Sequence, residues 1–210
     1  MRFYESSPTL DQEHLQFEKD IEAFVSGELN PIKFKAFRVA HGVYEQRQED
    51  TYMIRIRCAA GGLTPTQLKH ASEIAEEYGS GEVHFTTRQE IQVHDVLIDG
   101  VMPVIRGLLE VGLSTRGGGG NTIRNILTSP DSGTAKDEAF DVDPYAIALT
   151  TRMINEEDSE NTYEYDWYYK ILPTINKWNT DKNRIKDGKK VKAGFRYSSG
   201  NNDHWMTRKD

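Results

Sequence analysis

Hydrophobic residues recur at helical spacing in four stretches of the chain. Residues 10–26 are the first, and Gly27 lies near their end. Thr64 precedes Pro65, which predicts a capped helix start, and the apolar stripe that follows ends at Gly79. Residues 101–113 and a short stretch from Pro144 to about residue 154 predict two more helices.

Apolar and polar residues alternate in the stretches between these predicted helices, which is typical of β-strands. After a break at Asn30-Pro31, residues 33–47 predict one strand and residues 51–59 a second. The short polar segment 48–50 would join them as a hairpin. Residues 82–98 predict a further extended segment.

The order of elements from residue 33 to residue 113 is strand, strand, helix, strand, helix. This order predicts an α+β fold in which an antiparallel-rich sheet is covered by helices on one face. Four regions follow: a helical extension (1–32), the sheet domain (33–113), a partial second α/β segment (114–160) and a basic, aromatic tail (161–210) that resembles nothing we can place.

The net charge of −7 is unevenly distributed along the chain. Residues 161–210 contain 11 Lys+Arg and 6 Asp+Glu, a net of +5, which leaves −12 on the first 160 residues. An acidic chain argues against non-specific nucleic-acid binding. The basic tail suits either an acidic partner or a solvated surface.

Composition also limits the compartment and the kind of metal site. No apolar run is long enough for a membrane span, and the polar start differs from a signal peptide. The single cysteine, Cys58, excludes an intramolecular disulfide and a zinc site built on several cysteines, and we expect it in the core. We therefore expect a cytoplasmic protein without a metal ligand set of its own.

Basic and polar side chains gather at particular positions of the predicted strands. Arg55 and Arg57 would share one strand face, and the alternation of residues 82–98 would place His84, Thr86, Arg88 and His94 on one face of another. A glycine run, 117–120, precedes Arg124, which Asn121 and Asn125 accompany. Glycines allow backbone to approach a ligand closely. Converging arginines predict a site for a poly-carboxylate cofactor or a small oxyanion.

Each of these features also has a structural explanation. Arg55 and Arg57 would pair with carboxylates of this acidic chain, and His84 and His94 would be ordinary sheet histidines. The glycine run lacks the ending of a phosphate-binding loop. Only the arginines, histidines and glycine run taken together favour a site for a cofactor or an oxyanion.

The ordered motifs YMIRIRCAAGG, TTRQEIQ and STRGGGGNTIRNI resemble the sulfite and nitrite reductases that use sirohaem. The resemblance runs from about Phe34 to residue 154. It implies a ferredoxin-like half domain followed by the start of a sirohaem and iron–sulfur domain. It also implies a six-electron reduction of sulfite or nitrite, with an external electron donor.

The resemblance implies roles for individual residues. Arg55 and Arg124 would be catalytic, holding the oxyanion, with Arg57 as the competing choice for the substrate-facing arginine. The residues expected to bind the poly-carboxylate sirohaem are Arg57, His84, Thr86, Arg88, Asn121 and Asn125.

The sequence departs from this family at the cluster ligands. The family binds a 4Fe–4S cluster with four cysteines, and this chain has one. We therefore expect a part of a reductase that acts with its remaining half or with a second chain. The alternative is a non-catalytic module that kept the fold and binds a tetrapyrrole, an anion or a protein.

Overall fold

The computed structural model describes residues 9–119 and 124–156 and, as backbone only, residues 185–186, 189–190, 194–199 and 202–207. Its main sheet is antiparallel, with the strand order β1-β2-β4-β3. The strands are β1 (Val43–Glu45), β2 (Thr51–Ile56), β3 (Val83–Phe85) and β4 (Ile91–Leu97). Together with the helices this is the α+β class predicted from the sequence, which is confirmed.

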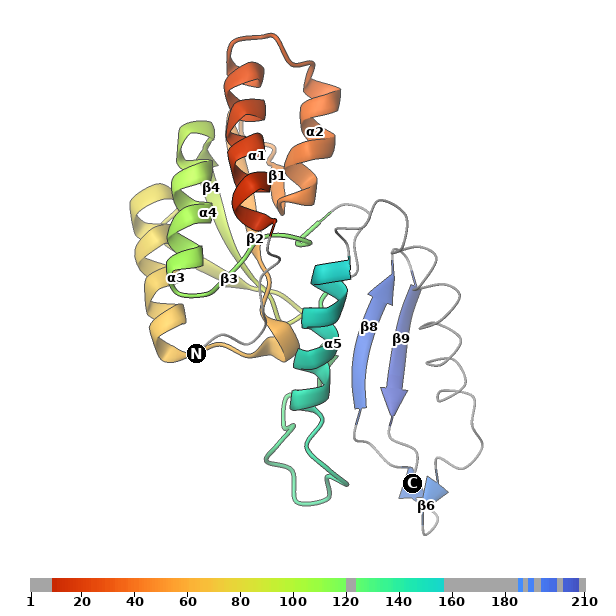
Figure 1. Cartoon of the computed structure of the whole chain (residues 1–210). Coiled ribbons are helices and arrows are strands. Elements are labelled where there is room, and N and C mark those ends of the chain that lie inside the picture. The colour runs from red at the N-terminus through yellow and green to blue at the C-terminus, as the bar shows by residue number, and fades with distance from the viewer. Residues whose placement is uncertain are drawn as a thin grey trace.

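Helices occupy the chain before, within and after the sheet. In Figure 1, α1 and α2 form a pair at the top, and α3 lies beside α4 on the left. Short turns of 3-10 helix follow β2 and β4. The helices are α1 (Leu10–Val25), α2 (Pro31–Ala40), α3 (Pro65–Tyr78), α4 (Val101–Glu110) and α5 (Asp143–Glu156), and the 3-10 turns are η1 (Ala59–Gly61) and η2 (Ile98–Gly100).

A single apolar core joins the sheet to its helices. The inward side chains of β2, Tyr52, Ile54 and Ile56, are buried as their alternation predicts. They form one cluster with residues of β4, α3 and α4, and with Phe17 and Phe34 of the α1–α2 pair. Burial of this face leaves the alternate residues of the same strands on the opposite face.

The capped start predicted for α3 is confirmed. The Thr64 hydroxyl accepts a hydrogen bond from the Gln67 backbone N–H at 3.1 Å, and the Gln67 side chain accepts one from the Thr64 N–H at 2.9 Å. This reciprocal pair is a capping box, with Pro65 in the first turn.

The strand predicted over residues 33–47 is wrong for its first part, where the chain forms α2. The Asn30 side chain accepts a hydrogen bond from the Ile32 N–H at 2.8 Å and caps this helix. Phe34 and Arg38, one helical turn apart, are both buried. The Asn-Pro pair read as a break is therefore a helix start.

The single extended segment predicted over residues 82–98 is also wrong, because the chain reverses direction between β3 and β4. The Thr86 N–H donates to the Glu90 carbonyl at 2.9 Å, and the Gln89 N–H to the Thr86 carbonyl at 3.1 Å. Gln89 adopts φ 56°, a left-handed conformation that closes the turn. The common face predicted for Thr86 and Arg88 on one strand therefore does not exist.

The second segment contributes a small sheet and α5. Strand β5 (Leu127–Thr128) pairs with β8 (Gly194–Ser199), which pairs with β9 (Asn202–Thr207). β6 (Ile185–Lys186) pairs with β7 (Lys189–Lys190). The side chains of the predicted tail, 161–210, lie outside the described residues. Among the helices that the structure describes, none has the length and apolar character needed to cross a membrane.

Candidate anion-binding site

Arg55 lies on the face of the sheet opposite the apolar core. It is flanked along β2 by the buried residues Ile54 and Ile56, whereas Arg55 itself is only partly buried. Across the sheet, Arg55 pairs in register with Gln92 of β4, and Gln92 pairs with His84 of β3. Three strands therefore place polar side chains in one row.

The Gln92 amide connects this row. With its oxygen turned toward Arg55, the amide accepts hydrogen bonds from Arg55 Nε at 3.2 Å and Nη2 at 3.1 Å. Its nitrogen then donates to His94 Nε2 at 3.2 Å. A carbonyl oxygen facing a guanidinium is the favourable orientation, because the donor carries charge. Gln92 thus holds Arg55 against the sheet.

The two arginines of β2 differ in their exposure. Arg57 is only 1% exposed, and its Nη2 donates to the Gly117 carbonyl. Arg55 is 16% exposed, and its Nη1 donates to the Gly118 carbonyl at 3.2 Å. Both arginines therefore bind the glycine loop, and Arg55 is the more accessible of the two.

The glycines of this loop pack against the protein's own backbone. A Cβ on Gly118 would approach the Thr115 carbonyl oxygen to 2.8 Å and the Arg55 carbonyl oxygen to 2.9 Å. A Cβ on Gly119 would collide with the Tyr44 hydroxyl. For these two residues, the need for glycine comes from close packing on β1 and β2, and not from a bound ligand as the sequence suggested.

A buried carboxylate, Glu90, lies among the arginines. It is 2% exposed, and its Oε2 is 3.8 Å from Arg55 Nε. Burial raises the pKa of the Glu90 carboxyl, while the charges of Arg57, Arg55, Arg124 and Arg88, in that order, lower it. The charges of the four arginines predicted as site residues therefore all act on one internal carboxylate.

Arg124 belongs to the same cluster. Its guanidinium is about half buried, and burial lowers its pKa, assisted by the like charges of Arg55 and Arg88. Glu90 and Tyr44 act in the opposite direction. The Arg55 guanidinium also lies over the Tyr44 ring, 5.1 Å from its centroid, a cation–π contact.

The turn between β3 and β4 positions Arg88. The Thr86 hydroxyl accepts hydrogen bonds from the Arg88 and Glu90 N–H groups, both at 3.2 Å. Asn125 also fixes this turn: its Nδ2 donates to the Arg88 carbonyl at 2.9 Å and to the Cys58 carbonyl at 2.8 Å. Thr86 and Asn125 therefore shape the backbone that carries Arg88.

The remaining predicted residues have different placements. His84 is exposed on β3, and its ring centroid lies 5.8 Å from that of His94, so the sheet register brings together the two histidines expected on one face. Asn121 lies outside the described residues. No group of three potential ligands for a metal ion occurs within the described part of the chain.

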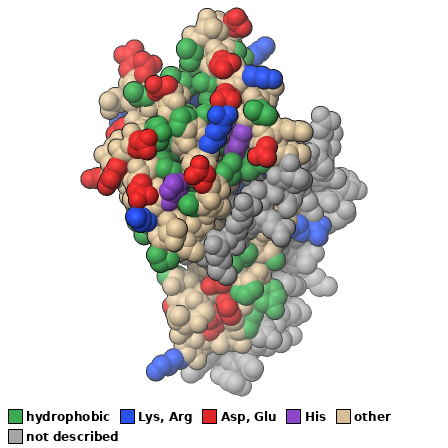
Figure 2. All heavy atoms as spheres, turned by 60° about the vertical axis from the view of Figure 1, so that its left-hand side comes forward, with side chains coloured by type: hydrophobic (Ala, Val, Ile, Leu, Met, Phe, Trp, Pro, Cys, Tyr) green, Lys and Arg blue, Asp and Glu red, His purple; other side chains and the backbone are tan. Residues whose placement is uncertain are grey.

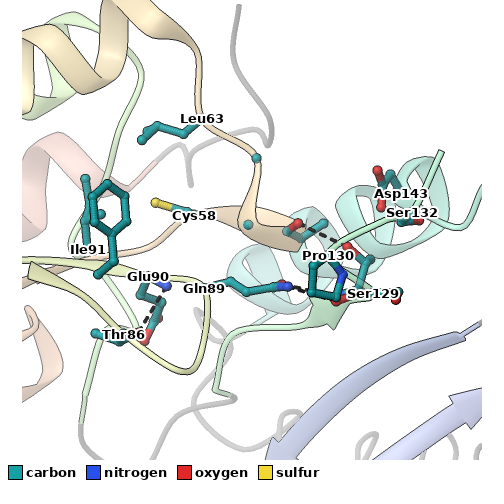
Figure 3. Close-up of a pocket in the computed structure, with 15 residues that line it drawn as sticks. Cys58, Leu63, Thr86, Gln89, Glu90, Ile91, Ser129, Pro130, Ser132 and Asp143 are labelled. Carbon is teal, nitrogen blue, oxygen red and sulfur yellow. Dashed lines mark hydrogen bonds between the residues drawn. The ribbon is translucent and has the colours of Figure 1, made fainter. Parts of the chain in front are cut away.

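A cavity of about 600 Å³ adjoins this cluster. Figure 3 shows Cys58, Glu90 and Ile91 on one side of it and Ser129, Pro130 and Ser132 on the other. Burial, followed by the charge of Glu90, raises the pKa of the Cys58 thiol to about 12. Cys58, expected in the core, is indeed buried and stays a neutral thiol near pH 7.

Sequence reasoning missed three members of the site: Tyr44, Glu90 and Gln92. Glu90 and Gln92 lie two residues apart in the TTRQEIQ motif. This spacing could have indicated that both side chains lie on the same face of a strand. Their partners follow from strand register, which the motif alone does not reveal.

The outer surface contrasts with this cluster. Acidic side chains are scattered over the face that Figure 2 presents, with few basic ones among them. The arginines that converge around Glu90 are partly or fully buried. The positive charge of these arginines is therefore concentrated inside an acidic protein and does not form a general basic surface.

Comparison with protein families gives one match. The profile of the Nitrite/Sulfite reductase ferredoxin-like half domain matches residues 44–111, which run from β1 to the end of α4. Tyr44, Arg55, Arg57, Arg88, Glu90 and Gln92 all fall within this range.

Curated relatives include nitrite and sulfite reductases. The assimilatory ferredoxin-dependent nitrite reductase of Haloferax mediterranei is 36% identical over 132 residues, which are 57% of this chain and 22% of that protein. A sulfite reductase (ferredoxin) of Mycobacterium tuberculosis is 30% identical over 107 residues, 51% of this chain and 19% of that protein. The match thus spans about a fifth of each relative.

A solved structure shares the fold. The Mycobacterium tuberculosis NirA protein superposes with a TM-score of 0.58 and 24% identity, covering 66% of this chain and 29% of that one. The superposition extends well beyond the 68 residues of the half-domain profile, so the fold likeness includes neighbouring elements.

Proposed function

We propose that this chain, which belongs to the nitrite/sulfite reductase family through its ferredoxin-like half domain, supplies the anion-binding arginines of a sirohaem-dependent reductase. The observation that supports this most is the convergence of Arg55, Arg88 and Arg124 around the buried Glu90. Guanidinium groups bind carboxylates and small oxyanions with paired hydrogen bonds.

The residues present fit the chemistry of such a cofactor. Sirohaem is a poly-carboxylate, and the partly exposed Arg88 and Arg124 are suited to its carboxylates, with His84 exposed beside them. When bound, the cofactor would supply the iron and the electron chemistry. The chain's own residues would orient it and neutralise its charge.

Arg55 is the better candidate for holding a small oxyanion such as sulfite or nitrite. It is more exposed than Arg57, and Gln92 and the Gly118 carbonyl fix its guanidinium. Arg124 would be its partner, since the two like charges already oppose each other and an anion between them would relieve that repulsion. Arg57 would act through the glycine loop, and Asn125 through the turn that carries Arg88.

The proposed activity needs more protein than this chain. A four-cysteine cluster cannot be built from Cys58 alone, which is buried as a neutral thiol. The remaining part of the reductase, or a second chain, would bring the cluster, and an external donor such as ferredoxin or NADPH would supply electrons. We therefore propose that the chain is inactive by itself and works in the cytoplasm as part of an assembly.

The alternative is a binding module without catalysis. It rests on the match to about a fifth of each relative and on the single cysteine. Such a module would use the same arginines, so the two proposals separate only when activity is measured together with a cysteine-bearing partner chain.

A spectroscopic titration tests the proposed site. Sirohaem is added to the full chain and to Arg88→Ala, with Arg106→Ala as the matched control. Arg106 is half exposed and pairs with Glu18 at 2.6 Å, away from the cluster. We expect saturable binding with a shifted Soret band, weakened in Arg88→Ala and unchanged in Arg106→Ala.

Equal weakening by both substitutions would show a general charge effect and contradict the site. Absence of binding by the folded wild-type chain would contradict the proposal that these residues alone recognise the cofactor.

A further inference from the structure

Among the described residues, Glu90 is the one carboxylate within the arginine cluster, and it also lines the cavity. Its side chain is 98% inaccessible, and Oε2 accepts no hydrogen bond, although it lies 3.8 Å from Arg55 Nε. A buried carboxylate oxygen without a hydrogen bond is costly when ionised. The group is therefore held between an ionised state that the arginines favour and a neutral state that burial favours.

The charged and titratable groups that face Glu90 come from every neighbouring element. Arg55 and Arg57 come from β2, Arg88 from the β3–β4 turn and Arg124 from the segment after the glycine loop. Cys58, after β2, is a neutral thiol on which the Glu90 charge acts. The other carboxyl group that lines the cavity is Asp143, on α5.

We infer that Glu90 is a proton-exchanging counter-ion of the arginine cluster, which takes up one proton when an anion binds to these arginines. This inference rests on the proposed anion site and adds its coupling to protons. Before an anion binds, the ionised carboxylate neutralises part of the cluster. When an anion arrives, two negative groups compete for the same guanidinium donors, and protonation of Glu90 removes the competition.

The proton balance is simple: the carboxylate accepts one proton from solvent and becomes a carboxylic acid, while the anion takes its place as counter-charge. Because Glu90 lines the cavity, the proton would reach it from that side without passing through the apolar core. In the proposed reduction, Glu90 would then donate this proton to an oxygen that leaves as water, while solvent supplies the second proton and the external donor supplies two electrons.

Linkage fixes the sign of the effect. If binding takes up one proton, the association constant falls tenfold for each pH unit above the pKa of Glu90 in the free protein and levels off below it. Glutamine mimics the protonated carboxyl, so Glu90→Gln should bind the anion with an affinity independent of pH. At high pH the variant should bind more tightly than wild type.

The experiment is a calorimetric titration of the full chain with nitrite, which stays a monoanion between about pH 5 and pH 9. Wild type, Glu90→Gln and Glu45→Gln are compared. Glu45 pairs with Arg38 at 2.8 Å on β1, outside the cluster, and is the matched control. Titrations in buffers of different ionisation enthalpy measure the protons taken up by wild type directly, even if Glu90→Gln fails to fold.

We expect uptake approaching one proton in wild type and Glu45→Gln, and none in Glu90→Gln. Nitrite binding without proton uptake, or with the same uptake in Glu90→Gln, would overturn the inference while leaving the anion site intact. Uptake that is instead abolished by His84→Gln or His94→Gln would assign the proton to the histidine pair and also overturn it. No nitrite binding at any pH would contradict the proposed oxyanion site itself, and with it the coupling.

Discussion

The two faces of the four-stranded sheet use buried groups in opposite ways. On the helix-covered face, Ile54 and Ile56 are fully buried among apolar side chains. On the other face, Glu90 is almost as deeply buried and Arg55 is partly buried, and charges and backbone carbonyls surround them. The first face gives stability, whereas the second places charges that a simple core would exclude.

Titratable groups show the same contrast. His41 packs with its ring stacked on Phe17, 4.2 Å between centroids, and burial, then the charges of His14 and Arg116, lower its pKa to about 3. No described carboxylate raises that pKa. By contrast, the charges of four arginines lower the pKa of the carboxylate Glu90, against the effect of burial. The first region keeps its histidine neutral near pH 7, whereas in the second, burial and the arginines shift the pKa of Glu90 in opposite directions.

The largest expected effect is on the apolar face. Ile54→Ala should lower the free energy of unfolding by about 4 kcal/mol, because it leaves a cavity in a fully buried site. Urea denaturation measures this, with Met53→Ala, a partly buried neighbour on the other face, as the control. If both substitutions cost the same, the division of the sheet into two faces would be incorrect.

The second effect is a loss of stability in acid that comes from His41. A histidine whose folded pKa lies below its ordinary value of 6.5 stabilises the fold fully above pH 6.5 and loses that contribution as pH falls toward 3. Between pH 6.5 and pH 4.5 the free energy of unfolding should fall by about 2 to 3 kcal/mol. Urea denaturation at both pH values checks this.

His41→Phe should flatten the dependence, although His14, whose pKa burial also lowers, keeps part of it. His84→Gln, at an exposed position, is the matched control. An unchanged pH dependence in His41→Phe would show that the acid sensitivity arises elsewhere.

The third effect concerns Asn125, whose side chain connects Cys58, after β2, with the turn between β3 and β4. Asn125 is fully buried and donates to the Cys58 and Arg88 carbonyls, so Asn125→Ala leaves two acceptors without their donor. We expect a loss of about 2 kcal/mol in unfolding free energy, together with weaker sirohaem binding because the turn carrying Arg88 loosens. Full sirohaem affinity in a destabilised variant would show that the turn does not position Arg88 for the cofactor.

The fourth effect is on binding rather than stability. Arg124→Ala removes one charged donor from the anion site and should weaken nitrite binding about tenfold, or about 1.4 kcal/mol. Its half-buried side chain opposes the like charges of Arg55 and Arg88, so the unfolding free energy should change little. Calorimetry and urea denaturation of the same sample compare the two quantities. A large loss of stability without loss of affinity would assign Arg124 to the fold.

The smallest effect is that of Glu90→Gln on stability. Because the folded pKa of Glu90 is raised above 4.5 by burial, its stabilising contribution is complete below pH 4.5 and is lost as pH rises through the folded pKa. Glutamine keeps the neutral form, so the variant should be slightly more stable than wild type at pH 7 and equal to it in acid. Thermal unfolding at several pH values measures this. Lower stability of the variant at pH 7 would mean that attraction to the arginines outweighs burial.

The sequence predicted the apolar face well, because local patterns determine it. The alternation Tyr52, Ile54, Ile56 and the Thr64-Pro65 helix start both act within a few residues. The helix α2 was missed because polar and apolar residues alternate over residues 33–36, although Asn30 already provided a cap. The alternation favoured a strand, whereas the cap favoured a helix. The helix forms because it buries Phe34 and Arg38, which lie one turn apart.

The polar face was only half predictable. The motifs identified the arginines, but the turn at Thr86–Glu90 has no glycine or proline, and Gln89 takes the left-handed conformation instead. The partners of Arg55, which are Gln92 across the strands and Gly118 some 60 residues later, depend on register and loop packing. Such long-range pairings are not encoded in spacing along the chain.

The most direct test of the anion site is a nitrite titration followed by nuclear magnetic resonance of the arginine Nε–Hε groups. We predict that the signals of Arg55 and Arg124 shift together with one saturating affinity, while that of Arg106 stays unchanged. Shifts of similar size at Arg106, or no saturable shift at Arg55 and Arg124, would contradict the proposed site.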